Sequence, residues 1–398
     1  MTEKKYLVPM SSPDITAADQ QSVLQVIQSQ YLSLGPKISE FEKAIKDYIG
    51  CQHAIGVSSG TSGLHLCVRA AGITQGDYVI TTPFSFVSST NVILFEQATP
   101  VFVDVDPVSG NIDSQQVELA AKALSSGSSQ DQKKWLPRRN MGQGGYLRAI
   151  LPVDVFGQPA DYDALRPIAD CHKIALIEDS CESLGALYND RKTGKLGDYG
   201  VFAFYPNKQI TTAEGGMIVT DDDSAAELMR SLRNQGRAPG DTWLQHTHLG
   251  YNYRLNELSA ALGVSQMKRI ESLLEKRQNA ADRYNQNLRS VSGVEIPRLM
   301  PQTTRMSWFV YVIRLQPGIH RDQTAARLEE EGIPVRPYFL PIHLQPYMVD
   351  RFGYRMGDYP ITEDLGKRSL ALPFSGIMTT DEVDLVCEKL VKCLTFEG

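Results

Sequence analysis

The sequence predicts an α/β protein with two domains, a large one built on a mainly parallel sheet and a smaller α+β one. Short apolar runs alternate with helical patterns as far as residue 222, which indicates buried strands covered by helices on both faces of a sheet. Past a long helical pattern at 253–288 this alternation ends. At 398 residues the chain is also too long for one small core. We therefore predict a large domain over 1–255, N-terminal segment included, and a connecting helix with the small domain over 256–398.

The individual elements are predicted from apolar runs that end in polar or glycine residues. The strands of the large domain are 53–59, 77–83, 99–106, 146–157, 173–180, 200–205 and 215–222. Helical patterns lie between some of these strands, at 60–72, 85–98 and 161–172. The small domain is predicted to contain a strand at 306–315 and helices at 322–333 and 380–394. The segment 124–145 is rich in Ser and Gly and carries charges, so we expect a long loop there.

Composition excludes several classes of function. A formal net charge of -6 supplies no basic surface for nucleic acid. The start MTEKKYLVPMSS has no apolar signal region, and no later run is long enough to span a bilayer, so we expect a cytoplasmic protein without a membrane partner. None of the six cysteines forms a CxxC pair, and the pair His246 and His248 is more typical of a solvated loop. No metal site is predicted.

One lysine stands out in FAFYPNKQITTAEGGM, residues 202–217. Lys208 lies between an aromatic run and a turn of small residues. An isolated lysine is usually a solvated surface charge, but a lysine whose pKa is lowered by burial or by a neighbouring cation forms Schiff bases with aldehydes. Pyridoxal 5'-phosphate (PLP) is the biological aldehyde most often bound in this way. Its site needs a phosphate cradle, an acid at the pyridine nitrogen and a flat group against the ring.

A phosphate cradle is offered by SSGTSG at 58–63, between a predicted strand and a helix start. Backbone N–H groups and the helix dipole favour an anion at such a position. Gly60 permits a close approach, and the hydroxyls of Thr61 and Ser62 can donate hydrogen bonds. Serine and threonine at helix starts are also ordinary N-caps, so this motif alone is a weak signal.

An acid and an aromatic residue follow in suitable places. Asp179 of IEDS ends a predicted strand, where ligands of open α/β sheets bind, although a helix cap is an equal alternative. Phe86 of PFSFVSS is placed either to cover the ring or to pack in the core. The order of cradle, aromatic, acid and lysine, all at strand ends, favours the cofactor site.

Six segments resemble the successive motifs of the DegT/DnrJ/EryC1/StrS family of sugar aminotransferases. They are SSGTSGLHL, TTPFSFVSSTNVILFEQATPVFVDVDP, LPVDVFGQPADYDAL, IEDSCESLGALY, GDYGVFAFYPNKQITTAEGGMIVTDD and LGYNYRLNELSAALGVSQMKRI. The resemblance implies the aspartate-aminotransferase fold (PLP fold type I) and a homodimer with shared active sites. It also implies amination of a nucleotide-linked keto-sugar, with PLP and its amine form PMP as cofactor and glutamate as the usual amino donor.

The resemblance assigns roles to the residues around the cofactor. Lys208 would form the Schiff base and move protons, Asp179 would pair with the pyridine nitrogen, and Phe86 would stack on the ring. Three residues would hold the phosphate: Gly60, Thr61 and Ser62. Ala203 departs from the family pattern, which often has serine five residues before the lysine, so one hydroxyl contact to the phosphate is expected to be missing.

The resemblance also assigns roles to residues farther from the cofactor ring. Glu182 occupies a position near the cofactor's ring oxygen, and Asn252 of GYNYR would reach the phosphate from the partner subunit. Arg254 and His343 resemble positions on the substrate side. Four charged residues of the 124–145 loop would either meet a nucleotide diphosphate or be solvated, and we expect solvation: Lys133, Lys134, Arg138 and Arg139.

Two rival functions come from the same family, a PLP-dependent sugar dehydratase and a non-catalytic regulatory relative. The dehydratase branch replaces the lysine with histidine, and a regulator is expected to lose Lys208 or Asp179. Both residues are present, which favours amination for cell-surface polysaccharide or antibiotic sugar biosynthesis. Glu182 resembles the branch that aminates C4 of 4-keto-6-deoxyhexoses. The sequence leaves open the nucleotide, the sugar, and amination at C3 or C4.

Overall fold

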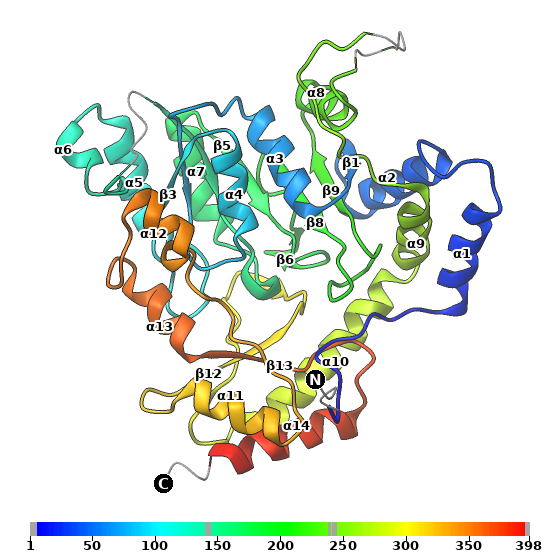
Figure 1. Cartoon of the computed structure of the whole chain (residues 1–398), viewed down its shortest axis with the longest axis vertical. Coiled ribbons are helices and arrows are strands. Elements are labelled where there is room, and N and C mark those ends of the chain that lie inside the picture. The colour runs from blue at the N-terminus through cyan, green and yellow to red at the C-terminus, as the bar shows by residue number, and fades with distance from the viewer. Residues whose placement is uncertain (1–5, 140–144, 238–239, 241–244, 395–398) are drawn as a thin grey trace.

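The computed structural model describes residues 6–139, 145–237, 240 and 245–394, and a seven-stranded sheet lies at its centre (Figure 1). The strand order is β1-β9-β8-β5-β4-β2-β3. The strands are β1 (His53–Val57), β2 (Tyr78–Thr81), β3 (Thr99–Phe102), β4 (Leu147–Leu151), β5 (Ala175–Asp179), β8 (Tyr199–Ala203) and β9 (Gly216–Thr220). β9 is antiparallel to both of its neighbours, whereas the other four pairs are parallel. The predicted mainly parallel sheet is therefore confirmed.

Helices cover both faces of this sheet because successive strand residues point in opposite directions. In β8, Val201 packs into the cluster beneath one set of helices and Phe202 into the cluster beneath the other. The first face is covered by α3 (Gly60–Ala70), α4 (Ser88–Phe95) and α8 (Asp223–Arg233). The second face is covered by α2 (Pro36–Ile49), α5 (Ser114–Ser125), α7 (Tyr162–His172) and α9 (Glu257–Met267).

The prediction of one long helix over 253–288 is wrong in two respects. It begins only at Glu257, because Asn256 caps α9 and the preceding residues form isolated bridges to other strands and loops. It is also interrupted, since α10 starts at Ile270 and runs to Leu288. At the break, Arg269 has non-helical backbone angles, and its guanidinium pairs with Asp14 and Asp19 of the N-terminal segment at 2.9 and 2.8 Å.

Other predicted elements are shorter than expected. The helix predicted at 85–98 is α4, Ser88–Phe95, and the strand predicted at 306–315 is β12, Tyr311–Leu315. The predicted 124–145 loop begins with the end of α5 and contains one short helix, α6 (Ser129–Gln132), capped by the hydroxyl of Ser128. Residues 140–144 of that segment lie outside the described residues.

The C-terminal part is an α+β unit. Its antiparallel sheet has the order β10-β12-β13, formed by β10 (Val294–Glu295), β12 and β13 (Ser369–Leu372). Its helices are α11 (Arg321–Glu330), α12 (Pro346–Phe352), α13 (Pro360–Arg368) and α14 (Thr380–Leu394). A small third sheet joins β6 (Leu187–Tyr188), β7 (Arg191–Lys192) and β11 (Thr303–Arg305). No helix of the described residues is long and apolar enough to cross a membrane.

The N-terminal segment lies against this C-terminal unit before it enters the large domain. The N–H of Leu7 donates to the carbonyl of Gly332, and the N–H of Phe374 donates to the carbonyl of Met10, both at 2.9 Å. The helix α1 (Ala17–Ile27) then packs against α9. A division of the chain at residue 255 stays a prediction.

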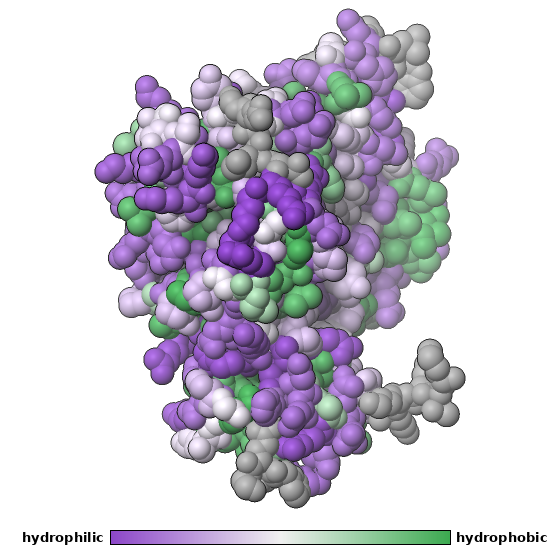
Figure 2. Space-filling model, turned by 60° about the vertical axis from the view of Figure 1, so that its left-hand side comes forward, coloured by the Kyte–Doolittle hydropathy of each residue, from purple (hydrophilic) through white to green (hydrophobic). Residues whose placement is uncertain are grey.

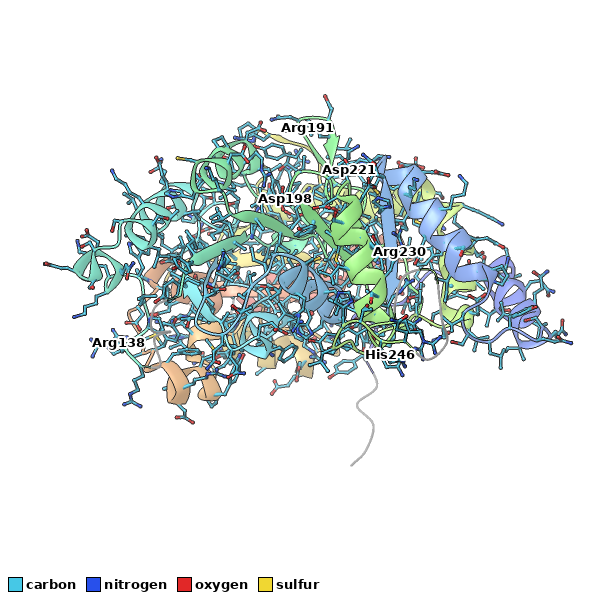
Figure 3. All side chains as sticks on the ribbon, turned by 90° about the horizontal axis from the view of Figure 1, so that it is seen from above. Arg138, Arg191, Asp198, Asp221, Arg230 and His246 are labelled. Carbon is cyan, nitrogen blue, oxygen red and sulfur yellow. The ribbon has the colours of Figure 1, made fainter. Side chains whose placement is uncertain are left out.

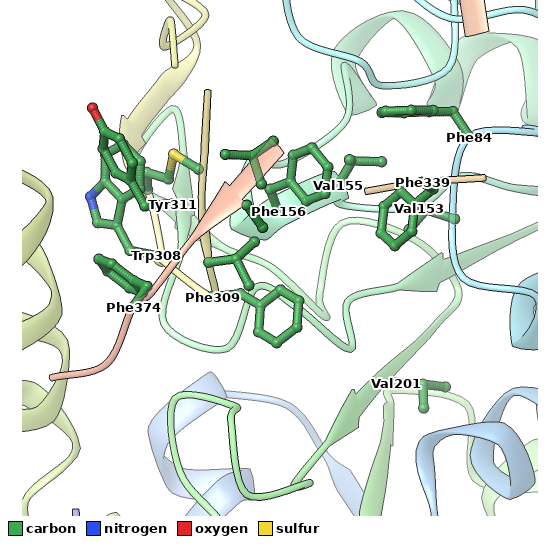
Figure 4. Packing of buried hydrophobic residues seen from close by; sticks show 14 of the residues in the cluster. Phe84, Val153, Val155, Phe156, Val201, Trp308, Phe309, Tyr311, Phe339 and Phe374 are labelled. Carbon is green, nitrogen blue, oxygen red and sulfur yellow. The ribbon is translucent and has the colours of Figure 1, made fainter. Parts of the chain in front are cut away.

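A shared aromatic core joins the two parts (Figure 4). The ring of Tyr311 stacks on Trp308 and lies against Phe374, with centroid distances of 5.8 and 6.4 Å. On the large-domain side, Phe156 stacks on Phe339 at 5.2 Å. Because these rings come from both parts of the chain, their burial holds the small unit against the sheet.

A buried arginine of α10 ties three segments together. Arg277 is 4% exposed, and its guanidinium donates to the carbonyls of Trp308, Phe309, Asn207 and Lys208 at 3.1, 3.2, 3.0 and 2.6 Å. Burial lowers the pKa of Arg277 to about 10, against a weaker opposite effect of Asp14. Four carbonyl acceptors therefore stabilise a cation that has lost its water.

We expect Arg277→Met to reduce the free energy of unfolding by about 3 kcal/mol, because four carbonyls, two of them in buried hydrogen bonds, lose their donor. Urea denaturation of the apoprotein measures this change. The matched control is Arg283→Met on the same helix, which removes a half-exposed ion pair with Asp384 and should have a much smaller effect. Equal losses in the two variants would contradict a special role for Arg277.

Candidate active site

A cavity of about 640 Å³ opens at the carboxyl ends of the parallel strands. Parallel strands bring the residues that follow them to one edge of a sheet, where ligands bind. Four such groups line this cavity: Gly60 after β1, Phe86 after β2, Asp179 at the end of β5, and Lys208 after β8. The segment 337–340 of the C-terminal part forms the opposite wall.

Lys208 is nearly buried at the base of this cavity. Its side chain is 12% exposed, and its Nζ lies 3.7 Å from Oε1 of Glu182 and 3.7 Å from the ring centroid of Phe309. The backbone around it is fixed, since its N–H donates to the carbonyl of Tyr205 at 2.9 Å and its own carbonyl accepts from Arg277. A primary amine held this far from water, and aimed at a cavity, is suited to act as a nucleophile or a base.

Glu182 provides the charge opposite this amine. Its Oε2 accepts the N–H of Phe156 at 2.8 Å, and Phe156 presents that N–H from a left-handed backbone conformation with φ of 61° in the short turn η1 (Val155–Gly157). Burial raises the pKa of Glu182, whereas the Lys208 ammonium and the Phe156 N–H oppose that increase. This environment therefore favours the neutral, protonated form of Glu182 more than water does.

Asp179 is fixed in the wall by two donors. Its Oδ2 accepts the hydroxyl of Ser89 at 2.8 Å, and its Oδ1 accepts the N–H of Cys181 at 3.3 Å. Ser89 is fully buried and shares a second hydrogen bond, at 2.8 Å, with the hydroxyl of Ser85. These contacts orient a carboxylate that is only 5% exposed toward the cavity.

The start of α3 forms another wall. Ser59 is its N-cap, and its hydroxyl accepts the N–H of Ser62 while the hydroxyl of Ser62 accepts the N–H of Ser59, at 3.1 and 2.9 Å. Gly60 and Thr61 line the cavity, but Ser62 does not, because this capping box uses its side chain. A Cβ on Gly60 would lie only 2.7 Å from Sγ of Cys181. Glycine therefore allows the close packing at this point.

The remaining predicted residues are divided between the cavity and other places. Phe86 lines the cavity and is 63% exposed, so its ring is accessible rather than packed in the core. Ala203 also lines it and carries no hydroxyl. Asn252 is exposed and pairs through its backbone with Asn234, away from the lining of this cavity.

Arg254 and His343 are also outside this lining. The Arg254 guanidinium donates to side-chain oxygens of Asn234 and Gln235, both at 2.7 Å. His343 is fully buried, with Nε2 3.0 Å from Oε1 of Glu363. The structure therefore places His343 in a packed cluster rather than at the surface of the cavity.

Some residues that line the cavity or support its wall were not anticipated. Ser89 belongs to the serine-rich start of α4, and that repeated hydroxyl pattern was an available signal. Phe309 and Tyr338 lie in apolar stretches that carry no sign of a site in the sequence, because only the packing of the C-terminal part brings them to the wall.

The residues present fit PLP. The cavity combines an amine, a fixed carboxylate, an accessible aromatic ring and a helix start whose glycine leaves room for a phosphate. Among the described residues, no group of three or more His, Cys, Asp and Glu side chains is arranged to hold a metal ion.

Comparison with known proteins agrees with this geometry. The sequence profile described as the DegT/DnrJ/EryC1/StrS aminotransferase family matches residues 13–391. The GDP-perosamine synthase of Caulobacter vibrioides is 35% identical, with 97% of this chain and 98% of that protein covered. The spore coat polysaccharide biosynthesis protein of Bacillus subtilis is 33% identical, with 97% of each covered. The structure of a DegT DnrJ EryC1 StrS aminotransferase from Brucella abortus is similar, with a TM-score of 0.84, 30% identity, and 96% and 95% of the chains covered.

The burial of Glu182 generates a prediction about pH. A carboxyl whose pKa is raised by folding adds stability below its ordinary pKa and loses that contribution as the pH rises through its folded pKa. We therefore expect the stability of the unsubstituted apoprotein, relative to Glu182→Gln, to fall as the pH rises from mildly acid to mildly alkaline. Thermal unfolding of both proteins across this range measures the difference.

Glu271→Gln is the matched control. Although burial opposes it, hydrogen bonds from Tyr48 and Arg305 lower the pKa of Glu271, so its contribution to stability should stay flat over this range and be lost only below its ordinary pKa. A flat or rising difference for Glu182→Gln would contradict the assigned effect of burial.

Proposed function

Because the chain belongs to the DegT/DnrJ/EryC1/StrS aminotransferase family and is a PLP-dependent sugar aminotransferase, we propose that it aminates a nucleotide-linked keto-sugar, a 4-keto-6-deoxyhexose. Glutamate is the proposed amino donor. The observation that carries the proposal is the meeting of the Lys208 amine, the Asp179 carboxylate and the Gly60 end of α3 in one cavity. The cytoplasmic location stays a prediction.

Each residue has a role that follows from its surroundings. Lys208 would hold the cofactor, and its amine would take a proton from the carbon of the donor that gives up the amine and supply one to the sugar carbon that receives it. The carboxyl of Glu182 lies 3.7 Å from this Nζ, so it is positioned to pair with the amine during that transfer. The two residues hold that proton where the surrounding wall excludes water.

Other residues orient the cofactor. Asp179 pairs with its ring nitrogen, Gly60 and Thr61 bind its phosphate, and Phe86 covers its ring. When bound, PLP supplies the electron sink that makes the carbon–hydrogen bond next to the amine acidic. A carboxylate fixed by Ser89 keeps its orientation without the reorganisation that a mobile side chain would need.

Two kinds of observation support the sugar substrate. Two relatives are GDP-perosamine synthases. The protein from Caulobacter vibrioides is 35% identical to this chain, and the protein from Vibrio cholerae is 31% identical. In its sequence context EDSCES, Glu182 also resembles the branch that aminates C4 of 4-keto-6-deoxyhexoses. A role in polysaccharide biosynthesis is supported by the name of the Bacillus subtilis relative.

A dehydratase of the same family is the second candidate, and a regulatory relative the third. The nearly buried Lys208 amine beside Glu182 argues against both, because neither function needs a buried amine beside a carboxylate.

The proposed function is tested by an assay of UDP-, GDP- and dTDP-linked 4-keto-6-deoxyhexoses with glutamate. We expect an amino sugar and 2-oxoglutarate from one of these pairs. A product that lacks a hydroxyl and has gained no nitrogen would identify a dehydratase instead.

The active unit is proposed to be a homodimer with shared sites. Exposed apolar side chains cluster on α1 and on the link to α2, which is typical of a surface that a partner covers: Leu24, Ile27, Leu32 and Leu34. Asn252 and Arg254 lie outside the lining of their own chain's cavity. We propose that Asn252 reaches the phosphate, and Arg254 the substrate, in the partner's cavity.

Asp179→Asn tests the role of the carboxylate. The amide keeps the shape and accepts the Ser89 hydrogen bond, but it cannot stabilise a protonated ring nitrogen. We expect retained cofactor binding and a loss of turnover of about a hundredfold or more, measured by single-turnover absorbance with glutamate. Near-normal turnover would make Asp179 a structural residue only.

Subunit mixing tests the shared sites. Lys208→Ala and Asn252→Ala/Arg254→Ala protomers are inactive alone in this account, but a mixed dimer contains one intact site if Asn252 and Arg254 act across the interface. We therefore expect activity to return after verified subunit exchange. If all three residues act within one chain, every site of the mixed dimer is damaged and no activity returns.

A further inference from the structure

A second cavity, of about 460 Å³, shares no lining residue with the catalytic one. It is bounded by the segment 133–138 on one side and by 354–361, between α12 and α13, on the other. Arg138 marks its place at the end of the molecule far from α1 and α2 (Figure 3). The face that comes forward in Figure 2 is mostly hydrophilic, with hydrophobic side chains in small patches.

Aromatic side chains form the inner wall of this cavity. Phe102 lies at its floor, with ring centroids 5.4 Å from Tyr354 and 5.9 Å from Tyr359. Trp135 lines the cavity from the other side, half-buried against the core under α5 and α7. Phe102 and Tyr354 are 1% and 4% exposed and pack behind this wall. The half-buried rings of Trp135 and Tyr359 offer the surface on which a planar ligand can stack, and they lose little conformational freedom when it binds.

The two sides of the cavity are fastened to each other. The Arg138 guanidinium donates to Oδ1 of Asp358 at 2.7 Å and to the carbonyl of Gly353 at 3.3 Å. The N–H of Arg139 donates to the carbonyl of Phe352 at 3.1 Å. The cavity is therefore a formed feature of the fold rather than a gap beside a free loop.

The charge at the rim is positive. Lys133 and Lys134 line the cavity, and across the described residues neither ammonium has an ion-pair or hydrogen-bond partner. The nearby carboxylates are already used, because Asp358 binds Arg138 and Asp104 accepts N–H groups from the start of α13. The sequence alone favoured solvated lysines here, but the aromatic wall beside them changes that interpretation.

We propose that this cavity is a second binding site, which takes a free nucleoside diphosphate. Its volume falls in the range of small-molecule sites. The base stacks on Trp135 beside Tyr359, and the phosphates bind Lys133 and Lys134. This inference does not depend on which sugar the catalytic site uses.

The second site adjoins the catalytic cavity through one short turn. The ring of His343 in η2 (Ile342–Leu344) lies 4.8 Å from that of Tyr359, and Gln345 just after it lines the catalytic cavity. On the other side of the turn, the N–H of Ile342 donates to the carbonyl of Pro83 at 2.8 Å, close to Phe86 in the chain. The buried His343 thus lies between the two cavities.

The test uses the holoenzyme labelled with 5-fluorotryptophan. The chain contains three tryptophans, so fluorine NMR resolves three signals, and Trp135→Phe identifies the one at the second site. UDP, GDP and ADP are titrated separately, with inorganic phosphate as a further arm. Trp308 precedes Phe309 of the catalytic cavity, so its signal reports that cavity independently. Failure of the proposed function and failure of this inference are thereby distinguishable.

We expect a saturable shift of the Trp135 signal with a nucleoside diphosphate. Lys133→Ala/Lys134→Ala should weaken this binding about tenfold. Lys46→Ala/Lys268→Ala, which removes the same charge from two exposed lysines elsewhere, should leave it unchanged. An unmoved Trp135 signal at several millimolar nucleotide would overturn the proposal. So would an equal shift with phosphate alone, or equal weakening in both double variants.

Discussion

The position of Lys208 depends on a buried guanidinium that belongs to a different helix. Arg277 of α10 donates to the carbonyls of Asn207 and Lys208 and to two carbonyls that precede β12. These acceptors stabilise the charge of Arg277, and Arg277 in turn fixes Lys208 opposite Phe309. The large and small parts of the chain therefore meet at the residue whose position matters most for the chemistry.

Buried charge is the second constraint on the site. Lys208, Glu182 and Asp179 are each less than one-eighth exposed, and charges in such places are stable only when they are paired or hydrogen-bonded. The fold meets this requirement with the Phe156 N–H, offered from a positive φ, and with the fully buried Ser89 hydroxyl. Local backbone strain at Phe156 thus serves the carboxylate that lies beside Lys208.

The sequence predicted the features that depend on neighbours in the chain. Apolar runs identified the strands, and their ends identified the edge at which Gly60, Phe86, Asp179 and Lys208 meet. Features set by distant partners were missed. The interruption between α9 and α10 involves Arg269 and two aspartates more than 240 residues before it.

Two site residues show the same limit. His343 is withdrawn from the cavity by Glu363, which a family motif does not reveal. Ser62 is taken by its own helix cap, an alternative that the residue type had left open. Asn252 and Arg254 stay predictions, because their proposed targets belong to a second chain.

The central claim is that Lys208 is the amine that binds the cofactor. Reduction of the PLP-loaded enzyme with borohydride, followed by peptide mapping, tests it most directly, because reduction makes the cofactor–lysine bond permanent. We expect one pyridoxyl group per chain, located on Lys208. A group on any other lysine, or no adduct in protein that demonstrably contains PLP, would contradict the account.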